Sequence, residues 1–484
     1  MFIRPKWTLE FDAGPHDDPH NAADQGGKSG TQTEGDSTKR FRQGSGPLSE
    51  LRLPRSGISN NSGTLRARLV ENARLTPVTH WQDVRHLTLV TSSQVEYAPG
   101  DTLTIFPNNF EEDVDQFLSL MGWTSIADEP VHFKPTLPAT DLQAYPPPPV
   151  PNISSNSAFT IRSLLLSLLD ITAIPRRTFF SQIAHFTTDQ MHKERLLEFT
   201  NPEYLDELYD YTTRPRRSIL EVLQEFQSVK IPWQWMGSVL PVLRGRQFSI
   251  ASGGVQKSAE GKGTKFQLLV AIVKYRTVIK KTREGVCTRY IAALPEGGEI
   301  DVLLQRGGLH IAKAEAKRPV VMVGPGTGVA PMRSLIWERW LWAQQMSYRN
   351  QSNGHGIANG YSSSIGESVL FYGCRNRNAD YFYGEEWEDL KNKIGLQVFT
   401  AFSRDQKQKV YVQDLIREQA ELVYRLLHQQ SGMVYICGSS GRMPQAVREA
   451  LIEVFERRGP MERAAAELYL LTMEKEGRYK QETW

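Results

Sequence analysis

The chain has 484 residues, a length that indicates about two to four domains rather than one compact core. Hydrophobic residues make up 40% and charged residues 23% of the sequence, as in ordinary soluble globular proteins. The formal net charge of +3 is too small to indicate nucleic acid or an anionic membrane as a partner, so neither is expected.

The three cysteines, Cys287, Cys374 and Cys437, lie far apart, and none belongs to a Cys-x-x-Cys pair. This spacing argues against zinc ribbons and disulfide frameworks, so no metal site is expected and a reducing compartment fits best. The opening "MFIRPKWTLEFD" lacks the apolar core of a secretory signal, and no apolar run approaches transmembrane length. We therefore expect a cytoplasmic protein without a transmembrane segment.

The first ordered part of the chain is predicted to be rich in strands. Residues 1–63 are expected to be disordered or a linker, because 13–63 are rich in Gly, Ser, Asp, Asn and Gln and nearly free of apolar residues. Order is expected from about Leu65, where "TLRARLVENARLTP" and "VRHLTLVTS" alternate as strands do. A Pro-Gly turn and another short strand are predicted within 97–109, before the proline-rich break "LQAYPPPPVPN".

The rest of the chain divides into two further patterns. Residues 155–235 show helical spacing of Leu, Ile and Phe, which predicts a helical subdomain between strand-rich regions. Strand patterns return at 246–253, 265–278 and 299–307. From Pro319 onward, short apolar strands alternate with amphipathic helices, which predicts a parallel sheet wrapped by helices, with a loop at 350–367.

The stretch "PVVMVGPGTGVAPMRSL" joins a strand ending at Val323 to a helix beginning at about Pro331. Proline suits a first helical turn, and glycines let the backbone approach a ligand beside the positive end of the helix dipole. The turn is therefore a candidate phosphate cradle, although G-x-G-x-x-G would need glycine where Val329 stands. An ordinary structural turn is the alternative.

A second candidate is "AFSRDQKQKVYVQD", which follows the third strand of the predicted sheet. Ligands of doubly wound folds lie beyond the carboxyl ends of the strands, and a coenzyme with a 2′-phosphate needs cations and hydroxyls there. That set is supplied by Ser403, Arg404, Lys409 and Tyr411. A solvated charged loop is the alternative.

Three more stretches are ambiguous when each is taken alone. "YICGSSGRMPQAV" places Cys437 at a strand end, where a buried structural cysteine is the more frequent explanation. "RGRQFSIAS" gives Arg246 and Phe248 defined faces of a strand, and the "GVCT" turn begins a helix whose N–H groups could hold pyrophosphate. The ending "GRYKQETW" carries a large ring at Trp484, which could simply dock the tail.

Taken together and in this order, these motifs resemble the ferredoxin-reductase-type FAD/NADPH enzymes, and more narrowly the diflavin reductases. The stretch "LVENARLTPVTHWQDVRHLTL" and the ending "ETW" are most similar to the NADPH-dependent diflavin oxidoreductases of cytosolic iron–sulfur cluster assembly. The resemblance covers residues 64–484.

The resemblance implies an antiparallel β-barrel FAD-binding domain over residues 64–318, with the helical subdomain inserted at about 155–235. An α/β doubly wound, parallel-sheet NADP-binding domain with a C-terminal aromatic tail would follow over 319–484. The implied cofactors are FAD and NADPH. Diflavin reductases also carry FMN in an N-terminal flavodoxin-like domain, which is not evident in residues 1–63, so the chain is expected to be a shortened form.

The family's motif positions imply two sets of binding residues. FAD would be held by Arg214, Arg246, Gln247, Phe248, Ser249, Gly285, Val286, Cys287 and Thr288. NADPH would be bound by Thr327, Ser403, Arg404, Lys409, Val410, Tyr411, Val412 and Gln413.

The resemblance also implies a hydride-transfer cluster of Ser249, Cys437 and Glu482, which would orient the nicotinamide by placement rather than by covalent chemistry. Glu482 stands where many relatives carry aspartate. Trp484 matches an aromatic lid that stacks on the flavin and must swing aside for the nicotinamide.

The implied function is hydride transfer from NADPH to FAD. Electrons would then pass, through FMN in full-length relatives, to the iron–sulfur cluster of an anamorsin-like protein. Association with mitochondria is implied besides the cytoplasmic location. Two alternatives remain: a stand-alone FAD reductase serving a separate flavodoxin or ferredoxin, which the helical insertion disfavours, and a non-catalytic adaptor.

Overall fold

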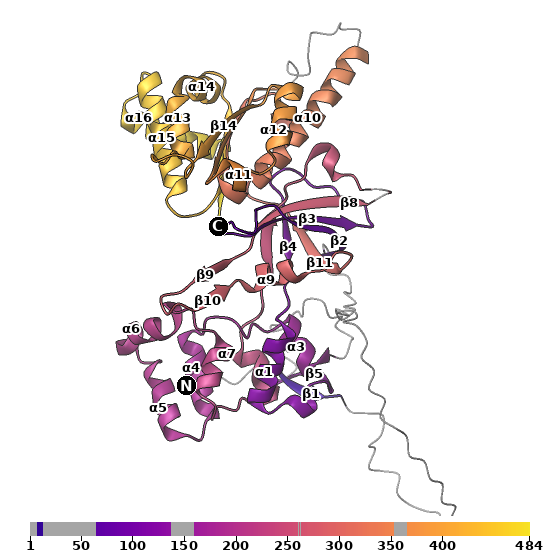
Figure 1. The fold of residues 1–484 in the computed structure, drawn as a ribbon, viewed down its shortest axis with the longest axis vertical. Helices are drawn as coiled ribbons and strands as arrows, with labels where there is room; N and C mark the ends of the chain where they lie inside the picture. The colour runs from indigo at the N-terminus through magenta and orange to yellow at the C-terminus, as the bar shows by residue number, and fades with distance from the viewer. Residues whose placement is uncertain (1–6, 13–63, 137–158, 260, 262, 353–364) are drawn as a thin grey trace, which may run out of the picture.

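The computed structural model describes residues 7–12, 64–136, 159–259, 261, 263–352 and 365–484. Most of the predicted disordered segment, the proline-rich break and most of the predicted 350–367 loop lie outside these residues. Within them the chain forms three bodies in a row: a helical subdomain at one end, a β-barrel in the middle and an α/β domain at the other end (Figure 1). No helix of the described ranges is both long and apolar enough to cross a membrane.

The barrel is one antiparallel sheet with strand order β7-β4-β11-β2-β3-β8. Its strands are β2 (Thr64–Arg74), β3 (Val84–Thr91), β4 (Thr102–Ile105), β7 (Arg246–Ser249), β8 (Thr264–Ala271) and β11 (Glu299–Gln305). A bridge between Ile250 and Leu268 joins the end of β7 to β8 and closes the barrel. Alternating apolar residues such as Leu87, Leu89 and Phe266 fill the interior, and helix α9 (Val286–Ala293) packs against it through Ile291.

The α/β domain has a five-stranded parallel sheet in the order β14-β13-β12-β15-β16. Its strands are β12 (Val320–Val323), β13 (Ser368–Cys374), β14 (Gln397–Phe402), β15 (Met433–Gly438) and β16 (Tyr479–Thr483). Its helices are α10 (Val329–Ser352), α11 (Arg377–Asp380), α12 (Gly384–Ile394), α13 (Val412–Glu418), α14 (Ala420–Tyr424), α15 (Met443–Arg458) and α16 (Arg463–Lys475). The strand order reverses between β12 and β15, which is where doubly wound folds place their ligands.

Both faces of this sheet are covered, and the strands are correspondingly apolar throughout. Met322 of β12 packs with α10 and α12 on one face, and its neighbour Val323 packs with α13 to α16 on the other. The fifth strand, β16, is an element that the sequence pattern did not predict. Arg478, which directly precedes β16, anchors the start of this strand. It is 7% exposed and donates to the carbonyls of Leu427 and Gly432.

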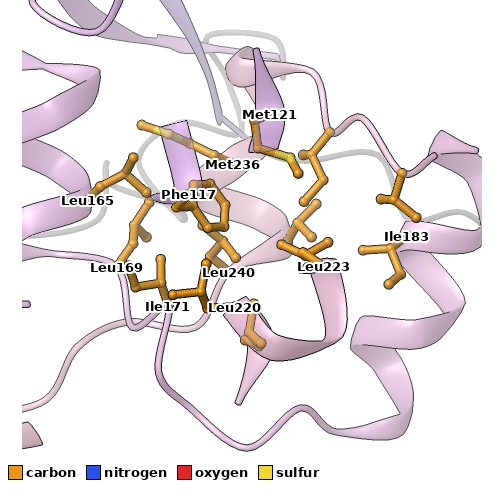
Figure 2. Close-up of a cluster of buried hydrophobic side chains, with 14 of the residues drawn as sticks. Phe117, Met121, Leu165, Leu169, Ile171, Ile183, Leu220, Leu223, Met236 and Leu240 are labelled. Carbon is orange, nitrogen blue, oxygen red and sulfur yellow. The ribbon is translucent and has the colours of Figure 1, made fainter. Parts of the chain in front are cut away.

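The helical subdomain is larger than the predicted 155–235. It contains α1 (Glu111–Met121), α3 (Ile161–Ser167), α4 (Arg177–Ile183), α5 (Gln190–Glu198), α6 (Leu205–Leu208), α7 (Ile219–Glu225) and α8 (Met236–Val239). Figure 2 shows its core, in which Phe117 and Met121 of the unpredicted α1 lie among leucines and isoleucines of the later helices.

The expectation of disorder from residue 1 onward is wrong for residues 7–11. Strand β1 (Trp7–Phe11) pairs antiparallel with β5 (Pro130–Pro135), which also pairs with β6 (Phe159–Thr160). Leu9 is 1% exposed in the helical core, and the ring of Phe11 lies 4.4 Å from that of Trp233. This burial offsets the cost of ordering the short segment.

The barrel contacts both of its neighbours through polar groups. A hairpin of β9 (Lys274–Arg276) and β10 (Thr282–Glu284) reaches the helical subdomain, where Arg283 pairs with Glu221 at 2.8 Å. On the other side, Arg333 of α10 donates to the carbonyl of Ala251 and pairs with Glu386 at 2.7 Å.

A second polar contact joins the barrel to the α/β domain. His86 Nδ1 lies 3.0 Å from the hydroxyl of Tyr383. Burial, helped by the charge of Arg333, lowers the pKa of His86 to about 4, so this histidine is neutral near pH 7.

Candidate functional site

A cavity of about 690 Å³ lies where the barrel meets the carboxyl ends of β12, β15 and β16. Barrel strand β7, the start of α9, the glycine turn after β12 and the end of β16 all contribute to its wall. The sequence-predicted residues that line it are Arg246, Gln247, Phe248, Ser249, Gly285, Val286, Cys287, Thr288, Thr327, Glu482 and Trp484. We call this the flavin-side cavity.

The predicted hydride-transfer cluster comes together because of strand register. β16 pairs parallel with β15 so that Glu482 lies opposite Cys437, and the Ser249 side chain comes close enough from across the domain boundary to offset part of the rise in the pKa of the Cys437 thiol. Cys437 is fully buried and does not itself line the cavity. Burial raises the pKa of its thiol far above the usual range, and the Glu482 carboxylate adds to the rise, so the sulfur is a neutral thiol.

Glu482 is the most unusual polar group of the cavity. Its Oε2 is buried and has no hydrogen-bond partner in the described part of the chain. Burial raises the pKa of this carboxyl. Because a buried polar atom without a partner costs stability, Glu482 is suited to accept a hydrogen bond from a ligand that enters the cavity.

Trp484 is held by its main chain while much of its side chain remains exposed. Its N–H donates to the carbonyl of Gly438 at 3.2 Å, and its carbonyl accepts from the N–H of Ser440 at 2.9 Å. The residue is 55% exposed and lines the flavin-side cavity. Trp484 therefore borders the cavity, and its role as an aromatic lid stays a prediction.

The glycine turn fits closely between β12 and β15. A Cβ at position 328 would lie 2.0 Å from the carbonyl oxygen of Cys437, so only glycine is tolerated there. Gly326 has a φ of +58°, in the left-handed region. A 3-10 turn over Gly326–Gly328 leads directly into helix α10 at Val329, with Pro331 in the first turn of α10 as predicted, so the N-terminal end of this helical unit lies at the switch point of the sheet.

The "GVCT" segment offers main-chain rather than side-chain groups. Helix α9 begins after Gly285 and has no side-chain cap. The Cys287 side chain is buried in the barrel core, and the Thr288 hydroxyl accepts from the N–H of Val273. The uncapped N–H groups at the start of α9 are thus available to an anion.

Two predicted FAD-binding arginines differ in their placement. Arg246 lines the flavin-side cavity, and among the described residues no carboxylate lies within ion-pair distance of it. Arg214 follows a π-helical turn, Tyr209–Thr213, and forms an exposed pair with Asp210 at 3.2 Å. Arg214 lines neither cavity, so the structure does not bring it to the site.

A second cavity of about 640 Å³ continues from the first beyond the glycine turn. The two share Gln82, Pro325, Gly326, Asp380 and Ser439 in their walls. Of the predicted NADPH residues, the second cavity is lined by Ser403, Val410, Tyr411, Val412 and Gln413. Arg404 and Lys409 are exposed on the same loop but are not part of its wall. We call this the adenosine-side cavity.

The adenosine-side cavity is surrounded by cations that lack carboxylate partners. Arg375 and Arg442 line it, and in the described ranges neither these two nor Arg404 forms an ion pair. Asp380 also lies in the wall, but its carboxylate accepts from the main-chain N–H groups of Arg375 and Asn376. The positive charge of these arginines, which no carboxylate balances, favours a coenzyme that carries a 2′-phosphate in addition to its pyrophosphate.

Comparison with known proteins decides the family. Residues 59–290 match the family model described as an FAD binding domain, and residues 322–449 match that of an oxidoreductase NAD-binding domain. The proteins called NADPH-dependent diflavin oxidoreductase 1 in Schizosaccharomyces pombe and Xenopus laevis are 38% and 36% identical, over 88% and 91% of this chain and 67% and 69% of their own lengths. The chain belongs to the NADPH-dependent diflavin oxidoreductase family.

A protein of the same name from Aspergillus fumigatus is 58% identical over 428 residues. That alignment covers 87% of this chain and 64% of the Aspergillus protein. The chain thus spans somewhat less than two thirds of the length of this diflavin oxidoreductase.

The cavities fit the cofactors of the diflavin oxidoreductase family. Within the described residues, the flavin-side cavity offers a guanidinium without a carboxylate partner at Arg246, uncapped N–H groups at α9 and a carboxylate oxygen without a hydrogen-bond partner at Glu482. An isoalloxazine with a pyrophosphate and a nicotinamide amide can use all of these groups. The adenosine-side cavity offers the cations and hydroxyls that a 2′-phosphate needs.

Sequence reasoning missed Trp81, Gln82, Arg375 and Arg442 of the cavity walls. Trp81 and Gln82 lie in the barrel loop between β2 and β3, and Arg375 directly follows β13. Arg375 and Arg442 each follow a strand of the parallel sheet, a position that could have pointed to them. The sequence contains no comparable signal for the barrel loop.

Proposed function

We propose that this diflavin oxidoreductase chain takes a hydride from NADPH into FAD and passes the electrons on singly. In the full-length proteins they would pass through FMN to the iron–sulfur cluster of an anamorsin-like protein in cytosolic iron–sulfur assembly. The observation that carries the proposal is the flavin-side cavity, to which the FAD-binding barrel contributes Ser249 and the NADP-binding domain contributes Glu482 and Trp484. FAD, when bound, supplies the conversion between two-electron and one-electron transfer.

The residues of the cluster act by position. Ser249 and Glu482 lie in the wall where two ring systems would have to meet, and each can hydrogen-bond a nicotinamide amide or a flavin edge. Cys437 is buried beside Ser249 as a neutral thiol and fills space behind the cavity wall. Such placement lowers the barrier by orienting the reacting groups and by excluding water.

Trp484 controls access in this proposal. Its ring can cover a flavin only when the nicotinamide is absent, and its main-chain bonds to β15 and to Ser440 keep it beside the site when the ring moves. The glycine turn and the first turn of α10 hold the pyrophosphate of the coenzyme, with Thr327 in the cavity wall.

The adenosine-side cavity supports NADPH as the coenzyme. Ser403, Tyr411 and Gln413 line it, and Arg404 and Lys409 would have to move only as exposed side chains to reach a 2′-phosphate. We further propose a cytoplasmic location, partly at mitochondria. The three cysteines, all free and buried, are consistent with a reducing compartment.

The experiment is to release the flavin from purified protein, to quantify FAD and FMN per chain, and to follow ferricyanide reduction with NADPH and with NADH. We expect stoichiometric FAD and NADPH-dependent reduction that is much faster than with NADH. Well-folded protein that binds no flavin would contradict the proposal and favour an adaptor role. Transfer from this chain, supplied with an FMN domain, to an anamorsin-like protein tests the partner.

A further inference from the structure

An exposed aromatic ring of the barrel lies in the wall of the adenosine-side cavity. Trp81 belongs to the loop between β2 and β3 and is 57% exposed. The guanidinium carbon of Arg375, which follows β13 of the α/β domain, lies 3.9 Å from the centre of the Trp81 ring. The pair therefore joins the two domains at the mouth of the cavity.

The exposure of this ring is not explained by folding. A tryptophan that loses so little surface contributes little to a core, and soluble surfaces avoid such rings where function does not need them. The cation over one face limits the orientations of the indole while much of the residue remains accessible. The contact therefore holds an aromatic surface in place beside the cavity.

The remaining wall of the cavity points to the ligand. A second aromatic ring, Tyr411, is 44% exposed and comes from the opposite domain. Arg442 adds a cation without a carboxylate partner among the described residues. Exposed aromatic rings combined with unpaired cations are the means by which proteins hold a nucleobase and its phosphates.

We propose that Trp81 is an adenine-binding residue that the barrel contributes to the coenzyme site. The base stacks on the Trp81 indole, and Arg375 both orients that ring and adds positive charge for the phosphates. Binding of the adenosine end then bridges the two domains, so the barrel recognises the coenzyme as well as the flavin. This inference rests on the proposed function, because it takes the nucleotide to be NADPH.

The test is calorimetric titration of the flavin-loaded chain with 2′,5′-ADP, which has the adenine and the 2′-phosphate but no nicotinamide. Trp81→Ala should weaken binding by about tenfold or more, the usual scale of one base–aromatic contact. Trp81→Phe should retain most of the affinity, since it keeps a ring. Val78→Ala is the matched control, because Val78 is 82% exposed on the same loop and lines neither cavity.

Trp81→Leu keeps apolar bulk without an aromatic face and should bind as weakly as the alanine variant. Equal affinity of wild type, Trp81→Ala and Trp81→Leu for 2′,5′-ADP would overturn this inference and leave the proposed function intact. A wild-type chain that does not bind 2′,5′-ADP at all would overturn both. If Trp81→Ala is too unstable to titrate, the contrast between the leucine and phenylalanine variants decides the question.

Discussion

The two cavities are built in different ways although they lie side by side. The flavin-side cavity takes its polar groups from strands whose register is fixed: β16 lies on β15, and Ser249 ends barrel strand β7. The adenosine-side cavity has its wall cations, Arg375 and Arg442, after the ends of strands, and a charged loop beside it carries Arg404 and Lys409 as exposed side chains. If the proposed function holds, the comparison teaches that the reacting groups sit on rigid elements, whereas a 2′-phosphate would be recognised by exposed side chains that can adjust.

The largest effect on activity should come from removing a polar group on the strands of the flavin-side cavity. Ser249→Ala deletes a hydroxyl in the wall of the flavin-side cavity, beside Cys437. We expect NADPH-dependent ferricyanide reduction to fall about 10²- to 10³-fold, the scale for one preorganised donor, with little change in the affinity for 2′,5′-ADP. Ser238→Ala is the control, because its hydroxyl donates only to the Trp235 carbonyl in the helical subdomain. An unchanged rate would remove Ser249 from the reaction.

Acid should weaken the interface between the barrel and the α/β domain, where the flavin-side cavity lies. The pKa of His86 is lowered to about 4 by burial and by Arg333, below the value near 6.5 of an unfolded histidine. The unfolded chain therefore binds the proton first, so stability is lost as the pH falls from about 6.5 to 4, by up to about 3 kcal/mol.

The check is chemical denaturation of wild type and His86→Gln as a function of pH. The variant keeps a polar side chain beside Tyr383 but cannot titrate, so its stability should fall less over this range. Parallel pH curves for the two proteins would show that His86 is not the group responsible.

Arg404→Ala tests the charged loop beside the adenosine-side cavity. Loss of one charge-assisted contact should raise the KM for NADPH about 10- to 100-fold and change the KM for NADH much less. Arg457→Ala is a suitable comparison, since Arg457 forms only an exposed pair with Glu453 on α15. An equal change with both coenzymes would mean that Arg404 does not read the 2′-phosphate.

The smallest expected effect concerns the carboxyl of Glu482. Burial raises its pKa, so it favours folding more in its protonated form. Relative to Glu482→Gln, the wild-type chain should be at its most stable below the ordinary carboxyl pKa and should lose that advantage as the pH rises through the raised value. Thermal unfolding of both proteins in the absence of coenzyme measures this difference. Glu462→Gln, which changes an exposed residue before α16, serves as the matched control.

Local patterns account for what the sequence predicted correctly. The glycine turn before α10, the "GVCT" turn before α9 and strand β7 are each readable over a few residues, and all of them contribute to the wall of the flavin-side cavity. The alternation of strands and helices after Pro319 predicted the parallel sheet, because both of its faces are buried.

What the sequence did not reveal depends on partners far along the chain. β1 is a strand only because β5 pairs with it more than a hundred residues later, as the register of Leu9 with Phe133 shows. Trp81 lies in a cavity wall beside Arg375, which follows a strand almost three hundred residues later in the chain. Arg214 was assigned by resemblance alone; it lines neither cavity and forms an exposed pair with Asp210, so its role in FAD binding stays a prediction.

The pairing of β16 with β15 also limits how the chain can vary in length. Successive side chains of a strand point to opposite faces, so inserting or deleting one residue between α16 and β16 would turn Glu482 away from Cys437 and move Trp484 along the edge. Surface connections ordinarily tolerate such changes. The connection between α16 and β16 does not tolerate them. Arg478 anchors the end of this connection to two carbonyls, and the following strand places Glu482 and Trp484 in the cavity wall.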